Sequence, residues 1–398
     1  MNRILTMLRE RKKHVSFHTP GHKYGKWDIT ELSFSDNLSC PTGVLRQAED
    51  DITAILGSAR SFILTDGSTC GVLSMLYASG VKKLLLLRES HKSAFNGCKL
   101  MGITPCILDR EGENGLPPVM KAEDIYPMKG KVDGVFLTSP DYYGRVPDLK
   151  AVRKACDDIG ACLIIDGAHG GHLKGTSLYA GTAADFWVDG VHKSMPAITQ
   201  GAVVSARERA EDLRRAVDIF RTTSPNYVIM ASVEYAVKAE PNEKVRAYAK
   251  KLIERYGIEN DDWTKLVVPV GEPANEVAAW LESKGIYPEF CDGNYIEFYI
   301  SDYNTVGELK KLEGLLSSLR AQTVRTVKHE RGKTGGRIFL VSYGDAVGKT
   351  CAKTCGLFPP CIPLVSEGEI FTEADAIRLK NAKNTYGTEG GKVYVYAG

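Results

Sequence analysis

Residues 161–172 read ACLIIDGAHGGH, an apolar run that ends in an aspartate and continues into glycines and two histidines. A strand that is apolar along its whole length fits a sheet that helices cover on both faces. The preceding stretch, Leu149–Ile159, carries apolar residues at three- and four-residue steps, which predicts an amphipathic helix. A helix, a buried strand and a polar turn in this order are typical of an α/β domain with a largely parallel sheet.

The same alternation of apolar runs and amphipathic stretches extends over residues 43–240. It predicts seven strands, at Phe62–Thr65, Lys83–Arg88, Thr104–Leu108, Val132–Thr138, Ala161–Asp166, Asp185–Val188 and Ala202–Ser205. It also predicts helices at Val44–Leu56, Cys70–Ser79, Ser93–Met101, Leu149–Ile159 and Arg207–Phe220. We therefore expect residues 43–240 to form a large α/β domain around a mostly parallel seven-stranded sheet.

The regular alternation of apolar runs and amphipathic stretches does not extend to the two ends of the chain. We expect residues 1–42 to form an N-terminal arm. We expect residues 241–398 to form a smaller C-terminal α+β domain, with strands and helices at Lys265–Val270, Asn275–Lys284, Tyr295–Ile300 and Val306–Leu319. The proline-rich stretch Phe358–Pro363 predicts a rigid extended loop, because proline restricts its own backbone and that of the residue before it.

Composition and charge exclude several classes of protein. Of the 398 residues, 43% are hydrophobic and 25% are charged, and no apolar run reaches the ~20 residues of a membrane span. Lys and Arg number 51 against 49 Asp and Glu, so a net charge of +2 attracts neither nucleic acid nor a membrane surface. The 10 cysteines include no CxxC pair and the N-terminus lacks a signal-peptide core, so we expect reduced thiols and a cytoplasmic location.

Two patterns imitate metal sites, and we expect no metal at either. The first is a run of three histidines spaced by four, in which Pro20 and Gly21 interrupt any helix: His14, His18 and His22. The second is a cysteine pair that has no second pair at ligand spacing: Cys351 and Cys355.

A third pattern, Gly344–Thr350, imitates a phosphate-binding loop and supports a rival prediction, a nucleotide-binding protein or phosphotransferase. A phosphate loop needs four residues between its first glycine and the Gly-Lys pair, and only three stand here. The stretch that follows also leaves little room for the long helix whose N-terminus would bind the phosphate. We therefore place this prediction second.

Four segments carry reactive side chains at the carboxyl ends of predicted strands, where ligands bind in open α/β sheets. The candidate site residues in them are Gly67, Ser68, Thr69, His91, Asp166, Ala168, His169, His192 and Lys193. Taken singly, each has an ordinary explanation as a solvated lysine, a helix cap or a turn residue. Their combination is what points to chemistry.

The combination matches the requirements of pyridoxal 5'-phosphate. The aldehyde of this cofactor bonds to a lysine amine, which Lys193 supplies. Its pyridine nitrogen needs a carboxylate, here Asp166, so that the ring can act as an electron sink. Its ring needs an imidazole or aromatic side chain to stack on, here His91. Its phosphate needs hydroxyls and N–H groups at a helix N-terminus, here Ser68 and Thr69.

Six segments also match the motifs of one known family. They are Phe17–Gly25 (TPGHK-x-G), Ser90–Ser93 (HKS), Asp166–His172 (similar to DEAHG-x-H), His192–Gln200 (similar to HK-x-LPALTQ), Thr223–Tyr227 (similar to TSPSY) and Ala346–Glu369 (similar to AVGR…YPPGIPL…GE). Through them the chain resembles the bacterial ornithine/lysine/arginine decarboxylases, pyridoxal-phosphate enzymes with the aspartate-aminotransferase-like fold (fold type I). The last match also explains the imitation of a phosphate loop.

The resemblance implies decarboxylation of arginine, lysine or ornithine to carbon dioxide and an amine of polyamine biosynthesis. It implies that His91 stacks on the cofactor, that Asp166 meets the pyridine nitrogen and that Lys193 bonds to the aldehyde. It also implies a homodimer with shared active sites, in which Thr223 and Ser224 reach the phosphate bound by the neighbouring subunit. Three candidates for returning a proton to the substrate α-carbon stay open: His192, Lys193 and His169.

The chain departs from the family pattern at several positions. Gly190 stands where a phosphate-binding serine is usual, and we expect the neighbouring Asp189 to add a negative charge near the phosphate. Gly167 replaces the usual glutamate after Asp166. The chain is also shorter than most members, and we expect it to lack the N-terminal wing domain of the long forms. These departures keep an alternative open: an aminotransferase, lyase or oxidase of the same fold that acts on a specialised amino acid.

Overall fold

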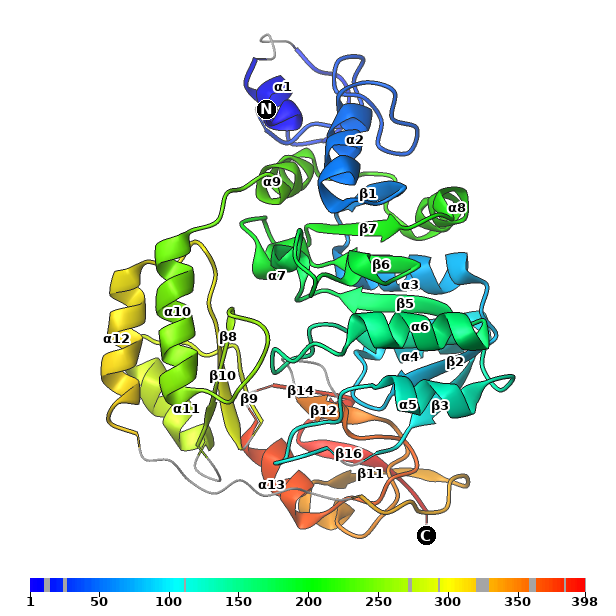
Figure 1. Cartoon of the computed structure of the whole chain (residues 1–398). Coiled ribbons are helices and arrows are strands. Elements are labelled where there is room, and N and C mark those ends of the chain that lie inside the picture. The colour runs from blue at the N-terminus through cyan, green and yellow to red at the C-terminus, as the bar shows by residue number, and fades with distance from the viewer. Residues whose placement is uncertain are drawn as a thin grey trace.

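The structure is a computed structural model that describes residues 1–10, 15–23, 27–110, 112–270, 274–292, 294–319, 329–357, 363–382 and 384–397. Its centre is a seven-stranded sheet with the strand order β1-β7-β6-β5-β4-β2-β3 (Figure 1). The strands are β1 (Arg60–Leu64), β2 (Lys83–Leu87), β3 (Thr104–Leu108), β4 (Gly134–Thr138), β5 (Cys162–Gly167), β6 (Phe186–Asp189) and β7 (Ala202–Ala206). All seven predicted strands are confirmed, with boundaries within two residues of the prediction.

The sheet is mostly parallel, as predicted. Strand β7 is antiparallel to both of its neighbours, β1 and β6. The other adjacent pairs are parallel. All strands except β7 therefore present their carboxyl ends at one edge of the sheet, which is where open α/β sheets bind their ligands.

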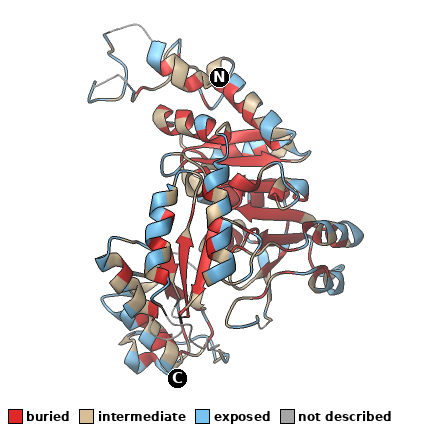
Figure 2. Ribbon diagram, turned by 60° about the vertical axis from the view of Figure 1, so that its left-hand side comes forward, coloured by how far each residue is buried: buried red, intermediate tan, exposed pale blue. Residues whose placement is uncertain are grey.

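Helices cover both faces of the sheet (Figure 2). Alternate residues of each strand therefore enter two separate hydrophobic clusters, one on each face. One cluster lies under α3 (Gly67–Ser79), α4 (Lys92–Met101) and α8 (Ala210–Phe220). The other lies under α2 (Val44–Leu56), α5 (Ala122–Ile125), α6 (Leu149–Ile159), α7 (Val191–Ser194) and α9 (Tyr227–Val237). The five predicted helices form, although α8 begins at Ala210 rather than at Arg207. Among the described residues, no helix is both long and apolar enough to cross a bilayer.

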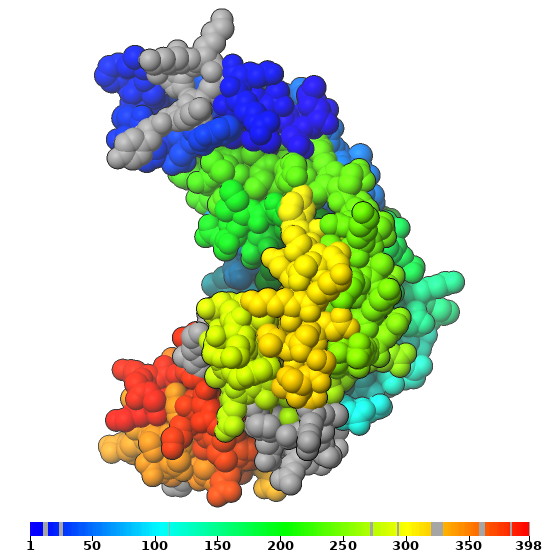
Figure 3. Space-filling view, turned by 90° about the vertical axis from the view of Figure 1, so that its left-hand side faces the viewer, coloured from blue at the N-terminus to red at the C-terminus, as the bar shows by residue number. Residues whose placement is uncertain are grey.

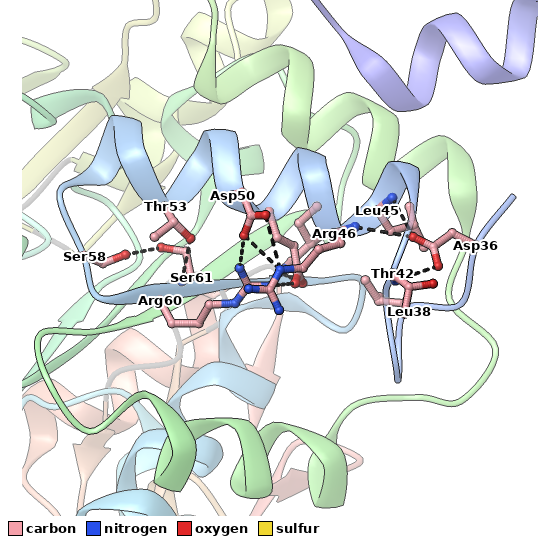
Figure 4. A network of polar contacts seen from close by, with 12 residues as sticks. Asp36, Leu38, Thr42, Leu45, Arg46, Asp50, Thr53, Ser58, Arg60 and Ser61 are labelled. Atoms are coloured by element: carbon pink, nitrogen blue, oxygen red, sulfur yellow. Dashed lines mark hydrogen bonds and ion pairs between the residues drawn. The ribbon is translucent and has the colours of Figure 1, made fainter.

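The N-terminal residues are tied to the large sheet through polar contacts. The helix α1 (Arg3–Glu10) packs on α9, where Glu234 accepts hydrogen bonds from the backbone of Arg3 and Ile4 at 2.7 and 2.8 Å. Figure 4 shows how Arg60, at the start of β1, contacts Asp50 on α2. The contact between Arg60 and Asp50 joins the edge strand β1 to α2, and β1 leads directly into α3.

Residues 243–316 fold around their own small sheet, of order β8-β10-β9. Its elements are α10 (Glu243–Tyr256), β8 (Lys265–Pro269), α11 (Ala274–Ser283), β9 (Phe290–Cys291), β10 (Tyr295–Tyr299) and α12 (Val306–Leu316). They enclose a hydrophobic cluster separate from those of the large sheet. The predicted strands and helices of this region are confirmed, and α10 lies outside the predictions.

Residues 338–396 form two further three-stranded sheets, of order β11-β16-β15 and β13-β12-β14. Their elements are β11 (Ile338–Ser342), β12 (Cys355–Leu357), β13 (Pro363–Val365), α13 (Glu373–Asn381), β14 (Thr385–Tyr386), β15 (Thr388–Glu389) and β16 (Lys392–Tyr396). The predicted proline-rich loop lies outside the described residues, except for Pro363. The domain boundaries at residues 42 and 240 stay predictions.

The rival nucleotide-binding prediction is wrong for the segment that motivates it. Gly344–Ala346 form a 3-10 turn. The residues that follow do not begin a helix: Thr350 forms a β-bridge with Ile370, and Cys351 forms one with Val395. A phosphate loop without a following helix lacks the aligned N–H groups that bind phosphate.

Candidate active site

A pocket of about 250 Å³ opens at the carboxyl ends of β1, β2, β4, β5 and β6. It brings together all of the candidate residues that the strand-end argument selects: Gly67, Ser68, Thr69, His91, Asp166, Ala168, His169, His192 and Lys193. These residues are spread over positions 67 to 193 of the sequence. They lie close together because the strands that precede them are close together in one sheet. Figure 3 shows the molecule hollowed between the green region that contains α7 and the orange and red C-terminal residues.

Asp166 is the buried anion of the pocket. It ends β5, and its carboxylate accepts a hydrogen bond of 3.1 Å from the backbone N–H of Ala168. Burial raises the pKa of Asp166, and the positive charge of Lys193 opposes that rise. A buried carboxylate of this kind is stabilised in its ionised form by a cationic partner, such as a protonated ring nitrogen.

Lys193 projects into the pocket from the short helix α7. Its backbone N–H donates to Gly190 at 2.8 Å, and the N–H of His192 donates to Gly201 at 3.0 Å, so the helix is anchored on both sides. The side-chain nitrogen of Lys193 lies 3.1 Å from Nε2 of His169. The amine is therefore held in one place inside the pocket.

The glycine at position 190 is required by the backbone around it. A Cβ atom there would lie 2.4 Å from the carbonyl oxygen of Ala168. Because that oxygen belongs to the main chain, it cannot move aside as a flexible side chain could. A serine at this position, usual in the resembled family, does not fit this backbone.

Asp189 does not line the pocket, and the expectation that it adds a charge near the phosphate is wrong. Its carboxylate accepts a hydrogen bond of 2.7 Å from the hydroxyl of Tyr179, to which the Trp187 indole donates at 2.8 Å. Burial raises the pKa of Asp189 to about 7. The side chain belongs to a buried network behind the pocket wall.

His91 presents a neutral ring to the pocket. It precedes α4, and its Nδ1 accepts a hydrogen bond of 3.2 Å from the backbone N–H of Ser93. Burial lowers the pKa of His91 to about 4, with a smaller effect from the charge of Lys193. At neutral pH the imidazole is therefore uncharged, and its flat face is suited to stacking on an aromatic ring.

The N-terminus of α3 forms the anion-binding side of the pocket. Gly67 adopts a φ of +74°, and its N–H donates to the carbonyl of Gln200 at 2.9 Å. Ser68 and Thr69 follow it in the pocket wall, and no side chain caps this 13-residue helix. The uncapped N–H groups and the two hydroxyls are the partners that a phosphate group takes at a helix N-terminus.

The pocket therefore fits pyridoxal phosphate in each of its parts. It combines an amine, a buried carboxylate, a flat neutral ring and an uncapped helix N-terminus at one sheet edge. The wall also contains Oγ1 of Thr138, which is buried and has no hydrogen bond among the described residues. This atom could bond to a ligand in the pocket.

Two predicted segments lie outside the pocket of their own chain. Thr223 and Ser224 are exposed and do not line it. The neighbouring Arg221 is buried and donates to the carbonyl oxygens of Ile63 and Leu38 at 3.2 and 2.7 Å. The chain therefore returns to β1 directly after α8.

The N-terminal signature segment is also placed apart from the pocket. Phe17 is 96% exposed, and Lys23 contacts the carbonyl oxygen of His18. Tyr24 and Gly25, which end the matched segment, lie outside the described residues. None of the described residues of this segment lines the pocket of its own chain.

The structure adds three residues that the sequence argument missed. Lys265 on β8 lies with its side-chain nitrogen 3.0 Å from Nδ1 of His169. Glu297 on β10 pairs with that nitrogen at 2.5 Å, and Tyr299 donates a hydrogen bond to the backbone oxygen of His169 at 3.2 Å. A signal was present in the sequence, because Lys265 and Glu297 are charged residues within otherwise apolar strands.

Comparisons with known proteins identify the family of the chain. Residues 26–260 match the family model described as the Orn/Lys/Arg decarboxylase major domain. The chain is 30% identical to the uncharacterized protein YaaO of Bacillus subtilis over 93% of this chain and 91% of that protein. It is 24% identical to an arginine decarboxylase of Halalkalibacterium halodurans, over 92% and 90% of the two chains. Its fold matches the lysine decarboxylase of Francisella novicida with a TM-score of 0.77 and 17% identity, over 99% of this chain and 81% of that one.

Proposed function

Because the chain belongs to the ornithine/lysine/arginine decarboxylase family, whose enzymes use pyridoxal phosphate, we propose that it removes carbon dioxide from a basic amino acid. The product is the corresponding amine, a precursor for polyamines. The observation that supports the proposal most is the convergence of Lys193, Asp166 and His91 on one pocket, from three different strand ends.

Each residue has a separate task in this proposal. Pyridoxal phosphate, when bound, supplies an aromatic ring that accepts the electrons left behind by carbon dioxide. Asp166 would keep a proton on the ring nitrogen, and His91 would hold the ring by stacking. Lys193 would hold the cofactor through its aldehyde. Ser68 and Thr69 would hold the phosphate, and His169, His192 and Lys193 are the candidates for returning a proton to the α-carbon.

A second, smaller cavity supports the proposal that the substrate has a basic side chain. It measures about 30 Å³ and shares Thr138 and Tyr142 with the cofactor pocket. Most of its wall is apolar: Leu87, Pro117, Pro118, Val119, Met120 and Leu137. Glu89 also lines it, and one carboxylate oxygen of Glu89 is buried without a hydrogen-bond partner among the described residues. We propose that this oxygen accepts the distal cation of the substrate.

The electrostatics of Glu89 agree with this role. Burial raises its pKa, and the positive charge of Arg88 only partly opposes the rise. A cation brought by the substrate would favour the ionised carboxylate. The cavity exceeds the roughly 10–15 Å³ that one water molecule needs, so an ammonium group has room there.

The experiment measures carbon dioxide release from lysine, ornithine, arginine and a neutral amino acid such as norleucine. We expect release from at least one basic substrate and none from norleucine. The variant Glu89→Gln should raise the KM for that substrate at least tenfold, because a hydrogen bond to a charged group contributes about 1.5–3 kcal/mol. The exposed Glu208→Gln is the matched control and should leave the KM unchanged. An unchanged KM in Glu89→Gln would remove Glu89 from the substrate site.

We also propose that the protein is a cytoplasmic homodimer with shared active sites. Support comes from the exposed positions of Thr223 and Ser224, which match a family segment that contacts a partner's cofactor but do not reach the pocket of their own chain. A shared site of this kind has twofold symmetry, so each dimer would contain two equivalent pockets.

A further inference from the structure

A line of four side chains connects the small sheet β8-β10-β9 to the catalytic pocket. The carboxylate of Glu297 pairs with the nitrogen of Lys265 at 2.5 Å. The same nitrogen lies 3.0 Å from Nδ1 of His169, and Nε2 of His169 lies 3.1 Å from the nitrogen of Lys193. Lys265 and Glu297 are 0% exposed, and His169 is 4% exposed.

The donors and acceptors along this line follow from simple chemistry. A lysine ammonium has three N–H donors and no acceptor, so Nδ1 of His169 must accept from Lys265. Burial lowers the pKa of His169 well below its ordinary value, and the charge of Lys265 lowers it further. The imidazole is therefore neutral and carries its only proton on Nε2. That proton points at Lys193, so the two groups form a hydrogen bond when the nitrogen of Lys193 offers a lone pair.

We infer that Lys265 is a positioning residue that fixes the Nε2–H form of His169 and thereby favours the unprotonated form of the Lys193 nitrogen. An unprotonated amine is the form that bonds to an aldehyde. The inference rests on the proposed function only in requiring that the pocket binds the cofactor. It does not depend on which amino acid is turned over or on the reaction outcome.

The position of Lys265 is set by a close approach of two backbones. Gly144 has a φ of +82°, and a Cβ atom there would come within 2.8 Å of Cβ of Lys265. The carbonyl oxygen of Gly144 accepts hydrogen bonds from the N–H groups of Asp261 and Asp262 at 2.9 and 3.0 Å. Strand β8 is thereby held against the large sheet, with Lys265 directed at His169.

The charge of Lys265 is compensated where it lies. A buried ammonium is costly unless a counter-charge and further partners accompany it. Glu297 provides the counter-charge, His169 accepts one N–H, and the ring of Tyr299 lies 3.8 Å from the nitrogen. Three directions around the side-chain nitrogen are therefore occupied.

Other ionisable groups face the same centre and remain in the variants described below. Around His169 and Lys193 they are His91, Asp166, His172, His192, Tyr142 and Tyr299. Asp262 lies behind them, paired with His172 at 2.7 Å. Because this background is constant, a difference between the variants reports on Lys265 and Glu297.

The test compares three variants of the cofactor-loaded enzyme: Lys265→Met, Glu297→Gln and the double variant. The measured quantity is the pH midpoint of the absorption change of the bound cofactor, which reports protonation of the nitrogen of Lys193. Removing the cation in Lys265→Met allows His169 to accept a proton from Lys193, so we expect the midpoint to rise by at least one pH unit. Removing the carboxylate in Glu297→Gln leaves the cation in place, so we expect no rise.

The double variant guards against a folding artefact, because it leaves no buried charge unpaired. We expect its midpoint to rise as in Lys265→Met. A rise in Glu297→Gln as large as in Lys265→Met would show that loss of packing is the cause, and would overturn the inference. A midpoint in Lys265→Met and in the double variant within 0.3 units of the wild type would overturn it as well. Neither result depends on carbon dioxide release, so failure here is distinct from failure of the proposed reaction.

The tautomer can be read independently by NMR of protein that contains ¹⁵N-labelled histidine. The signals of His169 are identified by their loss in His169→Gln. In the wild type we expect a protonated Nε2 and an unprotonated Nδ1. A protonated Nδ1 in the wild type would contradict the inference directly.

Discussion

The pocket combines charges that are costly when buried alone, and each is balanced by a neighbour. Burial raises the pKa of Asp166, and the neighbouring Lys193 opposes this rise. His91 and His169 are kept neutral by burial. The site is thus arranged so that one amine, one carboxylate and neutral imidazoles coexist at neutral pH.

Lys193→Ala should abolish turnover together with the visible absorption of the cofactor bound to the lysine. No other amine lines the pocket, whose only lysine among the described residues is Lys193. Borohydride reduction of the native enzyme should fix the cofactor mass on the peptide that contains Lys193. Finding that mass on Lys92 or Lys23 instead would refute the assignment.

Asp166→Asn should fold and bind the cofactor, yet lose about three orders of magnitude in kcat. An amide cannot hold the ring nitrogen protonated. If the pKa of that nitrogen falls by about three units, the transition state loses about 4 kcal/mol of stabilisation, roughly a thousandfold in rate. Steady-state kinetics and cofactor absorbance on the same sample check this. Near-normal kcat would mean that another residue serves the ring.

At the scale of elements, the large sheet could be predicted because its signals are local. Apolar runs such as Cys162–Ile165 indicate buried strands, and the polar turns after them indicate the sheet edge that binds the ligand. The helix α9 could not be found this way, since its apolar residues surround it and show no single face. Lys265 is marked by its charge in an apolar strand, but its contact with His169 could not be predicted, because the two residues are 96 positions apart in the chain.

Gly190→Ser tests whether the backbone itself excludes the family's usual serine. The added Cβ would meet the carbonyl oxygen of Ala168 at 2.4 Å, so we expect a lower melting temperature, equivalent to about 1–3 kcal/mol. Gly314→Ala in α12 is the matched control, because a Cβ there meets nothing within 4 Å. That change should be neutral or stabilising by about 0.5–1 kcal/mol. A Gly190→Ser protein as stable as the wild type would contradict the close-contact explanation.

At the scale of the whole molecule, the small sheet β8-β10-β9 lies beside the large sheet (Figure 1). Lys265 and Tyr299 of this small sheet contact His169, which lines the pocket. The pocket is therefore assembled from two parts of the chain that have separate hydrophobic clusters. A change in how these parts pack would alter the protonation of Lys193 without touching a pocket residue.

Shared sites in a dimer predict complementation between two defective chains. Thr223→Ala/Ser224→Ala should weaken cofactor retention at least tenfold, because each hydroxyl–phosphate hydrogen bond contributes roughly 1.5–3 kcal/mol. Mixing these chains with Lys193→Ala chains under subunit exchange creates dimers in which one site has both defects and the other has neither. Activity should reappear. If mixed dimers form and activity stays absent, Thr223 and Ser224 act within their own chain.

The most direct test of the central claim is turnover of lysine, ornithine and arginine in D₂O, with the products identified by mass spectrometry. Loss of the carboxyl group and return of one proton to the α-carbon should give the corresponding amine with a single carbon-bound deuterium, in equal amount to the carbon dioxide released. The same product should be absent with Lys193→Ala. A 2-oxo acid or aldehyde as the main product, without an equal amount of amine and carbon dioxide, would contradict decarboxylation at this pocket.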